Sequence, residues 1–330
     1  MKWLALAIVV FTACGPMDDT KTKAEAPSAR ILLGAERSPD ASHVAPGPPV
    51  GLPSAIEKRA RWGHVFVPEG FWSSDGAYDL MIHFHGAPAT VQSAFRRSQV
   101  NAVLYVMNLG DGPGRYEDRF QSAEAFNDLL ASLQDVVTGL EIMDTPTVRQ
   151  VALSSWSAGY AATRKILSHG ELPDSLDAVL LADGLHAPFV DKRARKVDAP
   201  SMDPYVGFAQ AAARGERFMS VAHSGVRTAG YASTSETSAY LIRALGLEVA
   251  NGEFDSPATL RLTSIAGRGK FIIRGYEGND EQAHAEHLKQ IDATLWRGLR
   301  ERWTSVTPPG KSTEQNLAPH RYAWRGANDD

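Results

Sequence analysis

Short apolar runs alternate with helix-like segments from about residue 56 to about residue 306 of the 330-residue chain. The apolar runs span residues 80–84, 102–107, 148–154, 178–182, 218–222, 260–265 and 270–276. Between two of these runs, large apolar residues recur at steps of three and four from Phe126 to Leu140, which is the spacing of an amphipathic helix. Strands separated by helices pair side by side in parallel, and the helices cover both faces of the sheet. The pattern therefore predicts an α/β fold with a mostly parallel, doubly covered sheet.

Three further segments have helical spacing, namely residues 158–169, 208–213 and 281–303. Ser233 and Glu236 have the spacing of a capping box, which predicts that another helix begins after Ser233. Ser122 is expected to be the N-cap of the helix that carries Phe126.

Composition narrows the classes of function. The chain is 43% hydrophobic and 22% charged, which is typical of a globular domain and excludes a disordered chain, a collagen-like repeat or a multi-span membrane protein. Its formal net charge of −4 leaves no basic excess for binding nucleic acid. With a single cysteine it has neither an intramolecular disulfide nor a CxxC-type metal or redox motif. No cofactor is expected.

The N-terminus has the pattern of a secretory signal peptide. Lys2 supplies a positive charge, residues 3–11 are an unbroken apolar run, and the small residues Thr12 and Ala13 precede Cys14. The small residues before a cysteine resemble a bacterial lipoprotein signal, although Phe11 stands where that family usually has leucine. The resemblance implies cleavage before Cys14 and lipidation of this residue, giving an exported protein anchored to a membrane and facing the periplasm or the cell exterior. The alternative is an ordinary signal peptide with an incidental cysteine.

The chain therefore divides into a signal peptide over residues 1–13, a lipidated cysteine and flexible tether over 14–55, a folded domain over 56–306 and a tail over 307–330. The tether is expected because Pro, Ala, Gly and Ser dominate this segment, which has few large apolar residues to bury. The tail has a similar composition, although Tyr322 and Trp324 could attach it to the domain.

A serine stands where an expected strand meets an expected helix. Residues 155–159 read Ser-Trp-Ser-Ala-Gly, with Ser157 flanked two positions away by the small residues Ser155 and Gly159. A sharp strand-to-helix turn needs small residues at these two positions, and it presents the central serine as a nucleophile above the sheet. The common form has glycine at both. The alternative is a small-residue turn that only packs the helix on the sheet.

Residues 81–87, Met-Ile-His-Phe-His-Gly-Ala, end an earlier apolar run. Together with the Ser157 turn they resemble the α/β-hydrolase family, in which a His-Gly segment after the third strand forms half of the oxyanion hole. The resemblance covers roughly residues 60–303. It implies a sheet of the α/β-hydrolase type in a single catalytic domain.

The resemblance also implies an oxyanion hole made of two backbone N–H groups. One belongs to Ala158, after the nucleophile, and the other to Ala87, because Pro88 has no N–H. Gly86 allows close approach of the backbone, and His85 is expected to support the loop rather than to transfer protons.

In this family the catalytic acid and histidine follow the serine in that order. Asp183 comes directly after the run 178–182, and the next run, 218–222, ends in His223 and Ser224 without a carboxylate. The family more often takes its acid from this next strand, but some members use the earlier one, so Asp183 is expected to be the orienting acid. The alternative is a turn or capping aspartate.

The histidine should follow the last strand, where both His284 and His287 lie. They are three residues apart and near one helical face. His284 is expected to be the base because it is closer to the strand, and His287 is the alternative. Asp280 is a rival acid that more naturally caps the last helix, and His223 is a rival base that would reverse the usual order.

The predicted function is that of a serine hydrolase that cleaves a small-molecule carboxylic ester through an acyl-enzyme. Two other functions stay open. The first is a zinc hydrolase that uses His83, His85, His284 and His287, with Asp280 as a further ligand. The second is a surface-anchored binding protein that has the hydrolase fold without its chemistry.

Overall fold

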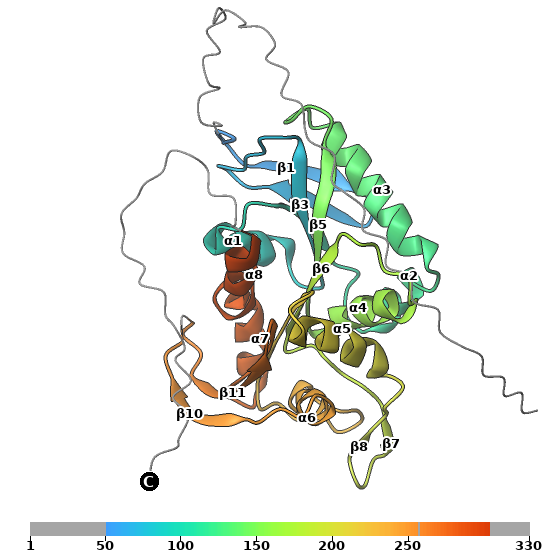
Figure 1. The fold of residues 1–330 in the computed structure, drawn as a ribbon, viewed down its shortest axis with the longest axis vertical. Coiled ribbons are helices and arrows are strands. Elements are labelled where there is room, and N and C mark those ends of the chain that lie inside the picture. The colour runs from blue at the N-terminus through green and yellow to red at the C-terminus, as the bar shows by residue number, and fades with distance from the viewer. Residues whose placement is uncertain (1–50, 257, 304–330) are drawn as a thin grey trace, which may run out of the picture. The chain divides into compact units, whose positions relative to one another are not determined.

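The computed structural model describes residues 51–256 and 258–303. Within them, ten strands form one sheet in the order β1-β2-β4-β3-β5-β6-β9-β12-β11-β10 (Figure 1). These strands are β1 (Ile56–Ala60), β2 (Gly63–Val67), β3 (Ala77–Phe84), β4 (Val103–Met107), β5 (Thr147–Trp156), β6 (Leu176–Ala182), β9 (Phe218–His223), β10 (Ala250–Phe254), β11 (Leu262–Arg268) and β12 (Phe271–Tyr276). A separate small hairpin joins β7 (Phe189–Asp191) to β8 (Lys196–Val197).

The centre of the sheet is parallel and its edges are antiparallel. Strands β4, β3, β5, β6, β9 and β12 pair in parallel, whereas β1 and β2 on one side and β11 and β10 on the other are antiparallel. Every residue of β4 and β6 is buried, as expected for strands covered on both faces. The expected fold class is confirmed.

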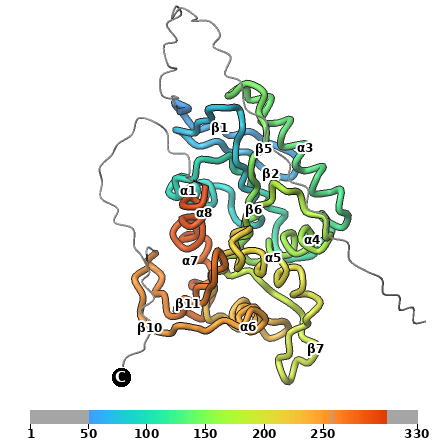
Figure 2. Tube along the Cα trace, in the orientation of Figure 1, coloured from blue at the N-terminus to red at the C-terminus, as the bar shows by residue number. Residues whose placement is uncertain are grey.

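Helices cover both faces of the sheet (Figure 1). On one face α1 (Pro88–Ser98), α7 (Glu281–Lys289) and α8 (Arg297–Trp303) bury residues such as Phe95, Leu288 and Leu299. The other face is covered by α2 (Gly114–Arg119), α3 (Glu124–Thr138), α4 (Tyr160–Ser168), α5 (Asp203–Ala213) and α6 (Thr234–Ala244). The trace in Figure 2 shows how α7 and α8, from the end of the described chain, return beside α1.

Two local predictions need correction. Ser122 does not cap α3, because the chain is already helical at Ala123, the N-cap, which makes no side-chain hydrogen bond. The expected helix over 281–303 is interrupted after Gln290 by a π-helical turn, η2 (Asp292–Trp296). Arg97 of α1 donates to the Lys289 carbonyl and to the Asp292 carboxylate, which satisfies a backbone carbonyl where the α-helical ladder breaks. The capping box of Ser233 and Glu236 is confirmed.

The strand order has a switch point between β3 and β5. From β3 the chain goes through α1 to β4 on one side, whereas β5 lies on the other side of β3 and leads into α4 on the opposite face. Ligands of open α/β sheets bind at such a switch point, beyond the carboxyl ends of the strands. The segments after β3 and β5 carry His85 and Ser157.

In the described part of the chain, no helix combines the length and the apolar character that a bilayer crossing requires. The signal peptide, Cys14 and all but the last five residues of the tether lie outside the described residues, as does the tail over 307–330. These assignments stay predictions.

Candidate active site

Ser157 lies in a strained turn between β5 and α4. It begins the short 3-10 helix η1 (Ser157–Gly159), and its φ angle of 49° is in the left-handed region that side chains rarely adopt. A Cβ atom on Gly159 would lie 2.2 Å from the carbonyl oxygen of Phe84, and one on Gly184 would lie 2.4 Å from the Ser157 nitrogen. The turn is therefore possible only because both neighbours are glycines. The other small position holds Ser155, which is fully buried.

The structure brings Ser157, His284 and Asp183 together. Nε2 of His284 lies 2.9 Å from Oγ of Ser157, and Nδ1 lies 2.8 Å from Oδ2 of Asp183. The three residues come from the ends of β5 and β6 and from the first turns of α7. With Asp183 ionised, Nδ1–H donates to the carboxylate and Nε2 is free to accept the Ser157 proton.

Asp183 is held by more than the imidazole. The Ser224 backbone N–H donates to Oδ1 at 3.0 Å, and the Ser224 hydroxyl donates to Oδ2 at 2.7 Å. Burial by itself would raise the pKa of Asp183, but the hydrogen bonds from His284 and Ser224 and the nearby His287 lower that pKa to about 2. The strand that lacks a carboxylate, β9, thus leads into the serine that orients the acid. The sequence showed Ser224 only as a neighbour of a possible base.

The segment after β3 is held by a chain of hydrogen bonds. The indole of Trp296 donates to Oγ of Ser154, the Ser154 hydroxyl donates to Nδ1 of His83, and Nε2–H of His83 donates to the carbonyl oxygen of His85, at 2.9, 2.9 and 2.8 Å. Burial lowers the pKa of His83 to about 3, so the ring is neutral. The turn that follows has φ angles of 70° at His85 and 119° at Gly86.

The two N–H groups assigned to the oxyanion hole stand where helices begin. Ala87 is the N-cap of α1 and precedes Pro88, whereas Ala158 is the second residue of η1. Helix starts leave N–H groups without a helical acceptor, and these groups favour negative charge. Among the described backbone bonds outside helices and strands, the Ala87 N–H has no acceptor.

The segment after β4 contacts the loop that follows β3. The Tyr116 hydroxyl of α2 lies 3.1 Å from Nδ1 of His85 and accepts the backbone N–H of Leu109 at 3.0 Å. This contact links the loop after β3 to α2.

The rival residues make other contacts. His287 is fully buried, edge-on to Tyr276, and both its ring nitrogens lack a partner in the described residues. Burial lowers the pKa of His287 to about 4. Asp280 is the N-cap of α7 and accepts the Ala283 N–H at 2.8 Å. His223 donates from Nδ1 to the carbonyl oxygen of Ser224 at 3.0 Å.

The geometry does not support the zinc alternative. Both ring nitrogens of His83 are engaged by Ser154 and by the His85 carbonyl. His284 is engaged by Ser157 and Asp183 through both of its nitrogens. Within residues 51–256 and 258–303, no three His, Cys, Asp or Glu side chains gather as a metal site would require.

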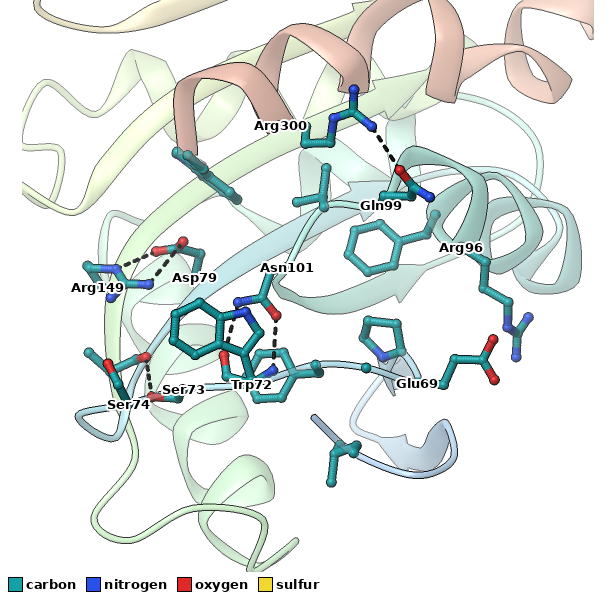
Figure 3. A pocket seen from close by; sticks show the side chains of 18 of the residues that line it. Glu69, Trp72, Ser73, Ser74, Asp79, Arg96, Gln99, Asn101, Arg149 and Arg300 are labelled. Atoms are coloured by element: carbon teal, nitrogen blue, oxygen red, sulfur yellow. Dashed lines mark hydrogen bonds and ion pairs between the residues drawn. The ribbon is translucent and has the colours of Figure 1, made fainter. Parts of the chain in front are cut away.

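A cavity of about 740 Å³ lies away from these residues (Figure 3). Its lining includes Ala77 and Asp79 at the start of β3 and Arg149 near the start of β5, whereas Ser157 follows the other end of β5. Trp72 is held in its wall by Asn101, which bonds both the Trp72 N–H and the Trp72 carbonyl.

No protein-family model matches the sequence, and no curated protein matches it. Among solved structures, the chain is similar to a hyperthermophilic esterase from the archaeon Pyrobaculum calidifontis, with a TM-score of 0.40, 14% identity and coverage of 76% of this chain and 87% of that chain. It is also similar to an ester hydrolase from the metagenome of Lake Arreo, with a TM-score of 0.44, 12% identity and coverage of 78% and 85%.

A third similar structure is an uncharacterised protein from Capnocytophaga ochracea, with a TM-score of 0.42 and 12% identity. The match covers 74% of this chain and 64% of that one, so this chain spans less than two thirds of that protein. TM-scores below 0.5 carry no inference about activity, which has to come from the residues of this chain.

Proposed function

We propose that this chain is a serine hydrolase that cleaves carboxylic esters of small molecules through an acyl-enzyme on Ser157. The observation that carries the proposal is the pair of hydrogen bonds that His284 makes, at 2.9 Å to Ser157 and at 2.8 Å to Asp183. A nucleophile bonded to a base, and a base bonded to an orienting acid, is the geometry of nucleophilic acyl transfer.

In the first step, Nε2 of His284 takes the Ser157 hydroxyl proton while Oγ attacks the ester carbonyl carbon. The negative charge moves to the carbonyl oxygen, where the N–H groups of Ala87 and Ala158 would stabilise it. The tetrahedral intermediate collapses, the bond to the leaving alkoxide breaks, and the alkoxide takes the proton from His284. An alcohol leaves, and the acyl group stays on Ser157.

In the second step, water gives a proton to Nε2 of His284 and attacks the acyl carbon. The second intermediate breaks its bond to Oγ, which recovers the proton from His284, and a carboxylic acid is released. Asp183 keeps the imidazole in the tautomer that accepts at Nε2 and stabilises the imidazolium of both intermediates. The strained φ of Ser157 holds Oγ ready for attack.

We also propose that the chain is exported and anchored to a membrane by lipid on Cys14. The sequence pattern of residues 1–14 supports this proposal, and these residues lie outside the described part of the chain. The domain would then face the periplasm or the cell exterior.

The decisive experiment is labelling with a fluorophosphonate, followed by a series of p-nitrophenyl esters of increasing acyl length. We expect the label on Ser157 in the wild type, no label in Ser157→Ala, and loss of esterase activity of ~10⁴-fold or more in that variant. Thermal unfolding should show that the variant is folded. Full activity in Ser157→Ala would disprove the serine mechanism. A folded wild type that neither labels nor hydrolyses any ester would favour the binding-protein alternative.

A further inference from the structure

Trp156, the residue before Ser157, stacks on two imidazole rings. Its ring centroid is 4.9 Å from that of His284, with 27° between the planes, and 5.0 Å from that of His85, with 7° between the planes. Its Nε1–H also donates to the backbone carbonyl of His284 at 3.0 Å. Trp156 therefore touches both the ring face and the backbone of the proposed base.

The ring contact supplies a constraint that the two hydrogen bonds of His284 do not. Bonds at Nε2 and Nδ1 hold two points of the imidazole, to Ser157 and to Asp183. Hydrogen bonds tolerate a range of angles, so the ring can still rock about its Cα–Cβ and Cβ–Cγ bonds while both hydrogen bonds are kept. A flat side chain packed against one face removes this freedom. A hydrogen bond to the carbonyl of the same residue fixes the backbone that carries the ring.

The contact also changes character during the reaction. When His284 takes the Ser157 proton its ring becomes a cation, and the negative π face of an indole attracts a cation. The attraction is absent while His284 is neutral. The contact with Trp156 therefore strengthens as charge develops, which is the condition for stabilising a transition state.

The second ring stacked on Trp156, that of His85, favours the neutral form. Burial lowers the pKa of His85, the nearby His284 lowers it further, and the opposing effects of Asp111 and Asn108 are smaller than that of burial. The Tyr116 hydroxyl holds Nδ1 of His85 at 3.1 Å. The stack is thus attached to α2, and the neutral form of His85 adds no second positive charge to it.

We infer that Trp156 is a positioning residue that fixes the tilt of the His284 ring and stabilises its protonated form. This inference rests on the proposed function. It assigns a role in the reaction to the residue between Ser155 and Ser157, a position that does not have to be small for the turn to form.

A pH profile can report this role because the other groups facing His284 keep their charge near neutrality. Hydrogen bonds lower the pKa of Asp183 to about 2 against the effect of burial, so the carboxylate stays ionised. Burial lowers the pKa of His186 and that of His287 to about 4, and it also lowers the pKa of His85. Protonation of Asp183, His186 and His287 should therefore contribute little to a change in kcat/KM between pH 5 and pH 9.

The test measures kcat and KM with p-nitrophenyl acetate from pH 5 to pH 9. Trp156→Leu removes the ring, Trp156→Phe keeps a ring face without the N–H donor, and Trp72→Leu removes an equal side chain from the remote cavity. For Trp156→Leu we expect kcat to fall ~10- to 100-fold, with KM within about threefold, because orientation is lost while binding is kept. The acid limb of kcat/KM should move to lower pH by about half a unit, because the protonated base loses its π partner.

Trp156→Phe should recover most of kcat and keep the wild-type acid limb, and Trp72→Leu should change neither. A Trp156→Leu enzyme with wild-type kcat and acid limb overturns the inference. Equal losses in Trp156→Leu and Trp156→Phe with an unmoved acid limb also overturn it, since they indicate a purely structural side chain. Should thermal unfolding show that the leucine variant is not folded, Trp156→Met provides the same comparison. If the proposed function itself is wrong, Ser157→Ala will remain active. This result distinguishes failure of the proposed function from failure of the inference about Trp156.

Discussion

Nδ1 of His284 and Oδ2 of Asp183 lie 2.8 Å apart, although the two residues are 101 positions apart in the sequence. Asp183 follows β6, and His284 follows β12, which is separated from β6 only by β9. These three strands are parallel, so their carboxyl ends meet at one edge of the sheet. The predictions below concern the roles of the residues at this edge.

Replacement of either partner of Ser157 should abolish turnover. We expect kcat to fall ~10⁴-fold in His284→Ala, which lacks the base, and ~10³- to 10⁴-fold in Asp183→Asn, which favours the wrong tautomer. His287→Ala and Asp280→Asn are the matched controls and should lose tenfold or less (~1.4 kcal/mol). Asparagine still caps a helix, so the second control keeps the start of α7. A larger loss of kcat in His287→Ala than in His284→Ala would show that His287 is the base.

Ser224→Ala should weaken the hold on Asp183 without removing it. The variant loses the hydroxyl bond to Oδ2 but keeps the backbone N–H bond to Oδ1. We expect the free energy of unfolding to decrease by about 1 kcal/mol. We also expect kcat to fall several-fold, because the acid is less well oriented. Chemical denaturation and steady-state kinetics measure the two effects. An unchanged kcat would show that the backbone bond suffices.

Stability should decrease in acid as Asp183 takes up a proton. The pKa of this carboxyl is about 2 in the folded chain and near 3.8 when unfolded, because the hydrogen bonds from His284 and Ser224 outweigh burial. The stabilisation is thus complete above about pH 4 and is lost as pH falls through 2. The difference in unfolding free energy between wild type and Asp183→Asn should therefore shrink by roughly 2 kcal/mol as the pH falls from 5 to 2. Titrations that do not depend on the charge of Asp183 cancel, so a constant difference would contradict the low pKa.

Gly184→Ala should disrupt the turn at Ser157. The new Cβ would lie 2.4 Å from the Ser157 nitrogen and 2.6 Å from its carbonyl oxygen, so the backbone must shift. We expect a loss of stability of at least about 2 kcal/mol and of most activity. Gly207→Ala in α5 is the control, since its Cβ meets nothing within 4 Å, and helix propensity should make it more stable by up to about 1 kcal/mol. Equal behaviour of the two variants would refute the steric explanation.

Cys14→Ala should release the protein from the membrane fraction or block its maturation. The reason is that lipid on this cysteine would supply the anchor. The measurement is fractionation after expression in a bacterial host that processes lipoproteins. A wild type found entirely in the soluble fraction would show that the lipoprotein reading is wrong.

The sequence by itself determined the fold class and the residues that stand at the strand ends. Apolar runs such as 178–182 are local, and their length and spacing reflect burial on both faces of a parallel sheet. The small residues around Ser157 are also visible in the local sequence, although the close contact that requires Gly159 comes from the Phe84 carbonyl at the end of β3. The edge strands β1 and β10 could not be predicted in this way, because half-exposed strands carry no continuous apolar run.

Only the tertiary structure decided which side chains meet. His284 and His287 lie near one helical face, and the sequence could not separate them. The cap at Asp280 sets where α7 begins, which turns His284 toward Ser157 and buries His287 against Tyr276. Ser224 and Trp156 acquire their partners in the same way, from strands and helices distant in sequence. Such contacts depend on the order of the strands in the sheet and on the rotation of each helix about its axis. The spacing of neighbouring residues in the sequence determines neither.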